Sequence, residues 1–303
     1  MPLRLDIKLT YQCNNHCRFC VQGSKRSEYS GFMPYDKVYA LLKSKKRSYS
    51  EVVFTGGEPT LHPDFIRLIE AAKRLGYNVH IQTNGRIFSY VEVCLNAVRA
   101  GADIFAVSIH GHTPELHDAL TRVPGSLRQS MRGIRNLLSL GKNVVTNTVI
   151  NKDNYHFLPH IAKFLTNAGV RQYQISYPHI AGHAATDMKE LVPRKSIVMP
   201  YVIKAIDFGI KNGYSPKIEA IPQCFLAEYG SCITDYDIPE TLIYEEEVSR
   251  DFSRWRVREG KLTGPKCRVC KYFKNCEGPW REYPQIFGWD EFVPVTIKHK
   301  KHV

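Results

Sequence analysis

The sequence predicts an α/β fold in which helices cover the outside of a parallel sheet. Six short apolar segments recur along residues 1–180, helical patterns separate them, and a glycine follows four of the helical patterns. Strands that alternate with helices in this way form parallel sheets. Such a sheet is either open and doubly wound or curled into a partial barrel.

The predicted elements follow one another at regular spacing. The strands are expected at Leu5–Thr10, Glu51–Thr55, Asn78–Thr83, Asp103–Ile109, Asn143–Val149 and Gln172–Tyr177. The helices between them are expected at Asp36–Lys43, Pro63–Leu75, Ser89–Arg99, Ser126–Leu140 and Phe157–Asn167. The glycines that suit left-handed helix C-caps are Gly76, Gly101, Gly141 and Gly169.

The pattern changes after a last helix, expected at about residues 196–212. From Gly213 the alternation of strands and helices is expected to stop, and the remaining chain is rich in Tyr, Pro and Cys. We therefore predict two domains, a barrel-like domain at 1–212 and a small domain at 213–303.

The composition excludes several classes of protein. Of the 303 residues, 43% are hydrophobic and 11% aromatic, which excludes a disordered chain. No segment approaches the ~18 apolar residues of a membrane span, and the N-terminus has no signal-peptide core. We expect a soluble, cytoplasmic protein. The net charge is +13, but the basic residues are dispersed apart from Lys45–Arg47 and Lys298–Lys301, so we expect solvated surface rather than a nucleic-acid interface.

The nine cysteines carry more information than the charge. An odd number of cysteines without a signal peptide argues against a disulfide framework, and six of them form two tight groups. The first group, Cys13, Cys17 and Cys20, follows the first predicted strand. Its thiolates suit zinc, with His16 as a fourth ligand, or an iron–sulfur cubane with one open iron.

The motifs of the first two loops carry a resemblance to a known family. Cys13, Cys17, Phe19 and Cys20 form a C-x3-C-x-aromatic-C pattern, and Gly56-Gly57-Glu58-Pro59 follows the second strand. The sequence thereby resembles the radical S-adenosylmethionine (SAM) superfamily over more than half of its length. The resemblance implies a partial (β/α)6 barrel of the TIM type, with a small C-terminal iron–sulfur domain.

The resemblance also implies a binding site. Cys13, Cys17 and Cys20 would hold a 4Fe–4S cluster whose open iron chelates the amino and carboxylate groups of SAM. The Gly56–Pro59 turn would meet the methionyl amino group, and the backbone beside Phe19 would touch the adenine. Further SAM contacts are implied at Thr83, Asn84, Ser108, Arg122 and Asn147.

One position departs from the family pattern. Many members read S-L-D-G where this chain reads Ser108-Ile109-His110-Gly111, so no role of that aspartate carries over.

The second cysteine group has C-x2-C-x5-C spacing at Cys267, Cys270 and Cys276. It resembles the SPASM and Twitch extensions, which bind auxiliary clusters, although zinc suits the same spacing. The SPASM motif continues to a further cysteine where this chain has Trp280, so we expect one auxiliary 4Fe–4S cluster.

The auxiliary cluster needs a fourth ligand. We expect Cys224 rather than Cys232, because Pro222 restricts the backbone just before Cys224 and apolar neighbours anchor it. Cys94, inside a predicted helix, is expected to be a buried thiol.

The resemblance implies an enzyme that cleaves SAM reductively to a 5′-deoxyadenosyl radical, which abstracts a hydrogen atom from a substrate. The substrate is expected to be a peptide. The alternative substrate is a sugar, an aminocyclitol or another small metabolite, which would be dehydrogenated or epimerised. RNA is a third candidate, and only the positive net charge of the chain supports it. A low-potential donor such as ferredoxin or flavodoxin would supply the electron. The alternative from another class is a zinc-stabilised binding module.

Overall fold

The computed structural model describes residues 3–23, 25–245 and 248–296, and the basic run Lys298–Lys301 lies outside them. A single curled sheet organises this part of the chain, in the strand order β7-β6-β5-β4-β3-β2-β1-β8-β9. Its strands are β1 (Arg4–Thr10), β2 (Glu51–Gly56), β3 (Asn78–Thr83), β4 (Ile104–Ser108), β5 (Asn143–Val149), β6 (Gln172–Ser176), β7 (Ser215–Glu219), β8 (Thr241–Glu245) and β9 (Val248–Asp251).

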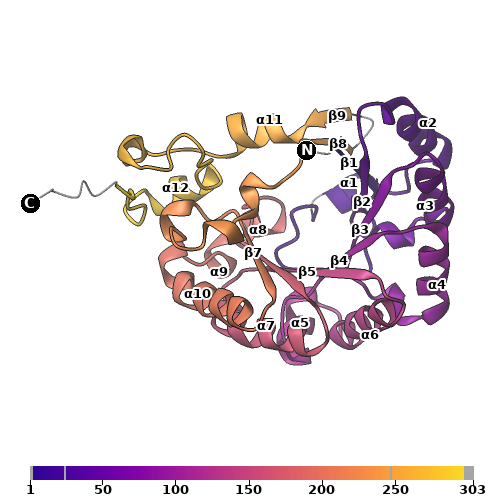
Figure 1. Cartoon of the computed structure of the whole chain (residues 1–303), viewed down its shortest axis with the longest axis horizontal. Coiled ribbons are helices and arrows are strands. Elements are labelled where there is room, and N and C mark those ends of the chain that lie inside the picture. Colours follow the sequence, from indigo (N-terminus) through magenta and orange to yellow (C-terminus); the bar gives the residue numbers. More distant parts are fainter. Residues whose placement is uncertain (1–2, 24, 246–247, 297–303) are drawn as a thin grey trace, which may run out of the picture.

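The helices of the described residues are α1 (Lys25–Glu28), α2 (Tyr35–Lys45), α3 (Phe65–Arg74), α4 (Val91–Ala100), α5 (Pro114–Thr121), α6 (Ser126–Ser139), α7 (Leu158–Asn167), α8 (His183–Thr186), α9 (Met188–Leu191), α10 (Lys195–Lys211), α11 (Phe252–Trp255) and α12 (Glu282–Phe287). The longer helices, α2 to α7 and α10, lie on the outer face of the sheet, whereas α11 and α12 lie with the C-terminal segment (Figure 1). No helix in the described ranges is long and apolar enough to cross a membrane.

The predicted fold class is confirmed as a partial barrel. Strands β7 through β1 to β8 pair in parallel, and the sheet curls without closing, because β7 and β9 are its edges. The four predicted glycine caps are also confirmed. They have left-handed φ values of +81°, +102°, +69° and +94° at Gly76, Gly101, Gly141 and Gly169.

The expectation that the strand–helix alternation stops at Gly213 is wrong. Strand β7 follows α10 directly and pairs in parallel with β6, so a seventh strand continues the barrel. Pro216 hid this strand in the sequence, because proline lacks the N–H of a central strand and is tolerated at an edge such as β7. The domain boundary at residue 212 stays a prediction, while the sheet itself extends beyond it.

The two faces of the sheet differ in polarity. Side chains on the outer face, such as Phe105, Val107 and Tyr173, are buried against the helices. The Tyr173 hydroxyl donates to Ala205 O of α10 at 2.6 Å, which fixes the direction of that face. Because side chains alternate along a strand, neighbours such as Gln174 point to the inner face. The interior of the curled sheet is therefore lined in part by polar groups.

Candidate active site

The first cysteine group lies in the loop that follows β1, at the carboxyl edge of the sheet. Cys13, Cys17 and Cys20 are all half-buried. Arg26 fixes the start of the loop by donating to Cys13 O and Asn15 O, both at 2.6 Å. The Arg26 side chain therefore holds the start of the loop through two backbone carbonyl groups, without involving the cysteine side chains.

The end of helix α5 holds the middle of the same loop. His16 N donates to Thr121 O at 2.9 Å, and Arg18 N donates to Leu120 O at 3.1 Å. The imidazole of His16, considered as a zinc ligand, is exposed. Its exposure does not favour a closed zinc site at this loop.

The two glycines after β2 allow this turn to touch the cysteine loop. Gly57 N donates to Thr10 O at 2.7 Å, and Glu58 N donates to Gln12 O at 2.8 Å. A Cβ atom on Gly57 would lie 2.3 Å from Gln12 O, closer than any side chain can approach. Glycine is therefore required at Gly57 by the protein's own backbone, whereas the sequence suggested an approach to a ligand.

The carboxylate of Glu58 joins the turns that follow β2 and β3. It is buried and accepts hydrogen bonds from Thr60 Oγ1, Thr83 Oγ1 and Asn84 N, each at 2.7 Å. Burial raises the pKa of Glu58, and these donors oppose that rise. Glu58 therefore connects the two turns, and the Thr83 hydroxyl donates to Glu58.

Asn84 extends this connection to the cysteine loop. Its side-chain amide donates to Asn14 Oδ1 at 2.6 Å and lies 3.9 Å from Cys13 Sγ. The loops after β1, β2 and β3 thus form one hydrogen-bonded unit.

A pair of buried histidines supports Phe19. The Phe19 ring meets the His110 ring edge-on, with centroids 4.5 Å apart. His110 Nδ1 accepts from Val149 N at 3.2 Å, and His117 Nδ1 accepts from His110 N at 3.1 Å. Burial lowers the pKa of both histidines, to about 4 at His117, so both are neutral at neutral pH. His110, where the sequence departs from the family pattern, thus packs against the proposed adenine site.

The remaining predicted SAM contacts lie farther along the same edge. Ser108 and Asn147 are register partners on β4 and β5. Arg122 has an exposed side chain and a left-handed φ of 57°, one residue after Thr121, whose carbonyl holds the cysteine loop. The structure therefore brings Ser108 and Asn147 together, and it places Arg122 next to Thr121, the residue whose carbonyl holds the loop.

Burial makes it unfavourable for the thiols of the first group to lose their protons. Burial raises the pKa of Cys13 to about 11, and burial together with the neighbouring Cys20 and Cys13 raises the pKa of Cys17 well above its usual range. A bound cationic metal centre would supply the charge that stabilises such thiolates.

The first group offers three thiol ligands, a donor set that suits zinc or an iron–sulfur cluster. Within residues 3–23, 25–245 and 248–296, no three His, Cys, Asp or Glu side chains are gathered as ligands of one bare metal ion. An iron–sulfur cubane takes its thiolates on separate irons, so its ligands surround a larger body.

The second cysteine group and Cys224 line one cavity. Its walls include Cys224, Cys267, Cys270 and Cys276, with apolar side chains such as Phe273. Burial, and then the three nearby cysteines, raises the pKa of Cys224 to about 12. Four cysteines thus line one cavity.

The other two cysteines lie elsewhere. Cys232 is buried near Tyr173 and Lys217 and does not line the cavity. Cys94 is fully buried in α4, as expected, and its thiol donates to Phe88 O at 3.0 Å.

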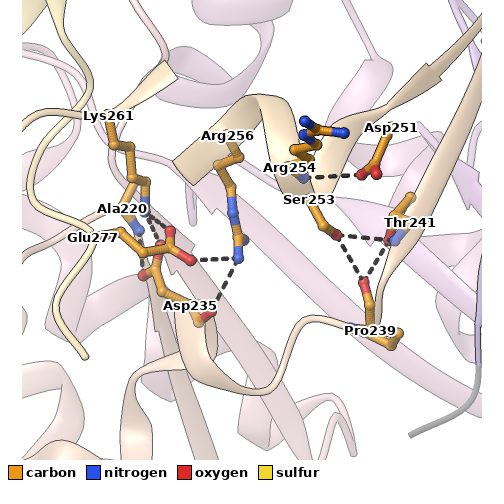
Figure 2. A network of polar contacts seen from close by, with 10 residues as sticks. All are labelled: Ala220, Asp235, Pro239, Thr241, Asp251, Ser253, Arg254, Arg256, Lys261 and Glu277. Atoms are coloured by element: carbon orange, nitrogen blue, oxygen red, sulfur yellow. Dashed lines mark hydrogen bonds and ion pairs between the residues drawn. The ribbon is translucent and has the colours of Figure 1, made fainter. Parts of the chain in front are cut away.

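A buried ionic network lies next to this cavity (Figure 2). Lys261 Nζ contacts Asp235 and Glu277, and Arg256 Nη2 donates to Glu277 Oε1 at 2.7 Å. Glu277 directly follows Cys276, so the network connects the cavity to the segment that contains Asp235. Buried charges that are paired in this way fix one arrangement of the surrounding chain.

Glu219, at the carboxyl end of β7, was not among the predicted site residues. It accepts from Gln174 Nε2 at 2.6 Å and from Ser176 Oγ at 2.9 Å. The signal that could have revealed it is the alternation of polar and apolar residues in Ser215–Glu219.

Comparisons with known proteins agree with this arrangement. The sequence model of the radical SAM superfamily matches residues 7–165. An AdoMet-dependent heme synthase of Oleidesulfovibrio alaskensis is 31% identical over 182 residues, 59% of this chain and 46% of that protein. A probable GTP 3',8-cyclase of Saccharolobus islandicus is 29% identical over 190 residues, 61% of this chain and 60% of that protein. The chain therefore spans less than two thirds of either relative.

The similarity in structure covers more of the chain. The crystal structure of Streptococcus suis SuiB bound to precursor peptide SuiA matches with a TM-score of 0.67 and 15% identity, over 92% of this chain and 72% of that one. At this identity the likeness shows a shared fold.

Proposed function

The chain belongs to the radical SAM superfamily, and from this premise we propose that it cleaves SAM reductively and abstracts a hydrogen atom from a substrate. The observation that carries the proposal is the contact between two loops at the carboxyl edge of the sheet. The loop of Cys13, Cys17 and Cys20 is hydrogen-bonded to the Gly56–Pro59 turn through Gly57 N and Glu58 N.

The chain's own residues have distinct parts in this proposal. Cys13, Cys17 and Cys20 are the ligands of a 4Fe–4S cluster, which when bound supplies the electron that breaks a carbon–sulfur bond of SAM. The Gly56–Pro59 turn and the backbone beside Phe19 orient SAM. Further contacts come from Ser108, Arg122 and Asn147, whereas Thr83 and Asn84 act mainly through the Glu58 and cysteine-loop hydrogen bonds.

We propose that the second cysteine group holds an auxiliary 4Fe–4S cluster of the SPASM or Twitch type. The support is the cavity that Cys224 shares with Cys267, Cys270 and Cys276. With four thiolates this cluster has no open iron, which suits electron transfer or a structural role better than substrate ligation.

We propose a peptide as the substrate. The support is that the fold likeness to SuiB covers 92% of the chain, and that SuiB was crystallised with a precursor peptide. A small metabolite is the second candidate, because the two sequence relatives are a heme synthase and a probable GTP cyclase. The electron would come from a low-potential donor such as ferredoxin or flavodoxin in the cytoplasm.

The test is the formation of 5′-deoxyadenosine from SAM. Protein reconstituted anaerobically with iron and sulfide and reduced with dithionite is expected to form this product. Cys17→Ala should abolish the product, and Cys232→Ala, which changes a thiol outside both groups, should retain it. A protein that binds zinc but forms no product would instead support the zinc-stabilised binding module.

A further inference from the structure

Glu219 lies on the inner face of the curled sheet, at the carboxyl end of β7. The preceding residue, Ile218, is fully buried on the opposite, helix-covered face, so the alternation of the strand directs Glu219 inward. Glu219 keeps a partial exposure to solvent. The side chain is therefore largely surrounded by protein on the inner face of the sheet, and the residue as a whole stays partly exposed.

Glu219 ends a row of polar side chains that begins at the proposed SAM site. Ser108 pairs in register with Asn147, and Ser176 pairs with Glu219 on the next two strands. Ser176 Oγ lies 2.7 Å from Asn147 Oδ1 and 2.9 Å from Glu219 Oε2, which links the two pairs. A substrate that lies beside SAM along this edge would meet Ser176 and Glu219.

The hydrogen bonds within the protein do not satisfy this carboxylate. The Ser176 hydroxyl has a single proton, so it cannot donate to Asn147 and Glu219 at the same time. When the Ser176 hydroxyl donates to Asn147, Gln174 Nε2, at 2.6 Å, is the only group among the described residues that donates a hydrogen bond to the carboxylate of Glu219. A carboxylate has room for about four donors.

The ion pairs of the nearest cations are made with carboxylates other than Glu219. Lys261 contacts Asp235 and Glu277, and Arg256 contacts Glu277 (Figure 2). Across the ranges that the structure describes, Glu219 has no ion pair of its own. Burial and the neighbouring Asp235 raise the pKa of Glu219, and the hydrogen bond from Ser176 and the more distant charges of Lys261 and Arg256 offset this rise only in part.

We propose that Glu219 recognises a protonated amine on the substrate. An ammonium group supplies both things that the carboxylate lacks, namely N–H donors and a positive charge. The inference rests on the proposed function and narrows its substrate to polar amines. A lysine-bearing peptide and an amino sugar are two sources of this same group.

The experiment uses two matched pairs of probes with reconstituted, SAM-loaded protein. The peptide pair is the N-acetylated, C-amidated tripeptide Ala-Lys-Ala and its equally blocked counterpart with norleucine in place of lysine, so that the lysine carries the only amine, and the sugar pair is glucosamine and glucose. Calorimetric titration should show that the amine of at least one pair binds tighter than its neutral counterpart by about tenfold or more. The pair that shows this preference identifies the source of the amine.

The variants connect that preference to Glu219. Glu219→Gln should lose the preference for the amine, and Glu51→Gln, which changes a carboxylate at the start of β2, should keep it. A thermal melt of Glu219→Gln confirms that this variant is folded. No preference in either pair, or a preference that survives in Glu219→Gln, would overturn the proposal.

The same samples separate this inference from the proposed function. Formation of 5′-deoxyadenosine without any amine tests the proposed function alone. Wild-type protein that forms this product but does not discriminate between the members of either pair would refute only the role of Glu219.

Discussion

The Glu58 carboxylate accepts a hydrogen bond of 2.7 Å from the backbone N–H of Asn84. Glu58 follows β2 and Asn84 follows β3, so this bond joins two neighbouring turns. The side chain of Asn84 then reaches Asn14 in the cysteine loop. Three loops at the carboxyl edge therefore depend on one buried carboxylate.

Glu58→Gln is expected to destabilise the protein. Glutamine has one acceptor oxygen where Glu58 has two, so a buried donor such as Asn84 N loses its partner, at a cost of about 2 kcal/mol. Urea unfolding would measure the change. Glu51→Gln, which loses a partly exposed ion pair with Arg4, should cost about 1 kcal/mol or less. Equal costs for the two variants would show that the Glu58 connection does not stabilise the fold.

If the chain binds two 4Fe–4S clusters, the amount of iron bound per chain is defined. Seven cysteines grouped as three and four should bind about eight irons per chain. Changing Cys13, Cys17 and Cys20 together to Ala should leave about four irons, in the auxiliary cluster. Iron and sulfide assays after anaerobic reconstitution measure both values, and a triple variant that keeps all of its iron would disprove the assignment.

Cys224 and Cys232 should differ in their effect on the auxiliary cluster. In the triple-variant background, Cys224→Ala should lose or degrade the remaining cluster, because this thiol lines the cavity of Cys267, Cys270 and Cys276. Cys232→Ala should retain the cluster. Absorption spectra and iron content would distinguish the two. The reverse result would assign the ligand to Cys232, and intact clusters in both variants would indicate an auxiliary cluster with an open iron.

Glu219→Gln is expected to stabilise the protein, increasingly so as the pH rises. The folded state raises the pKa of Glu219 above its ordinary value of 4.5, so between these two pKa values the folded chain holds a proton that the unfolded chain has lost. Wild-type stability therefore falls across this range as the pH rises, and Glu219→Gln removes that loss. The variant should show almost no gain in stability below the ordinary pKa of 4.5 and its full gain above the raised pKa of the folded state. Melting temperatures across that range would measure the difference, and a gain independent of pH would contradict the assigned cause.

Much of the barrel could be predicted because its strands are buried on one face and end at glycine-rich turns. Hydrophobic segments and glycine helix caps such as Gly76 are local signals in the sequence, and the caps are found in the structure where they were predicted. Strand β7 was missed because Pro216, which lacks a backbone N–H, argues against a strand although the segment alternates between polar and apolar residues. Strand β8 was missed because its pairing with β1 depends on residues far away in the chain, which no local pattern records.

The candidate site was predictable in its parts but not in its connections. The spacing of the cysteines indicated a metal site in the loop of Cys13, and the resemblance to the family motifs assigned roles to this loop and to the Gly56–Pro59 turn. Two contacts depend on how neighbouring loops meet in space. They are the close approach of Gly57 to Gln12 O and the hydrogen bond from the Thr83 hydroxyl to Glu58. The inward direction of Glu219 likewise required the position of β7 in the sheet.

The pairing of β1 with β8 has a consequence for the order of assembly. Arg4 lies opposite Thr241, so the strand that precedes the cysteine loop gains its second neighbour only when most of the chain has been made. During synthesis one edge of β1 stays unpaired and open to association with other chains. Such distant pairing also slows folding. A ribosome-bound chain that stops before Thr241 should therefore recruit chaperones, and insertion of iron should follow the release of the complete chain.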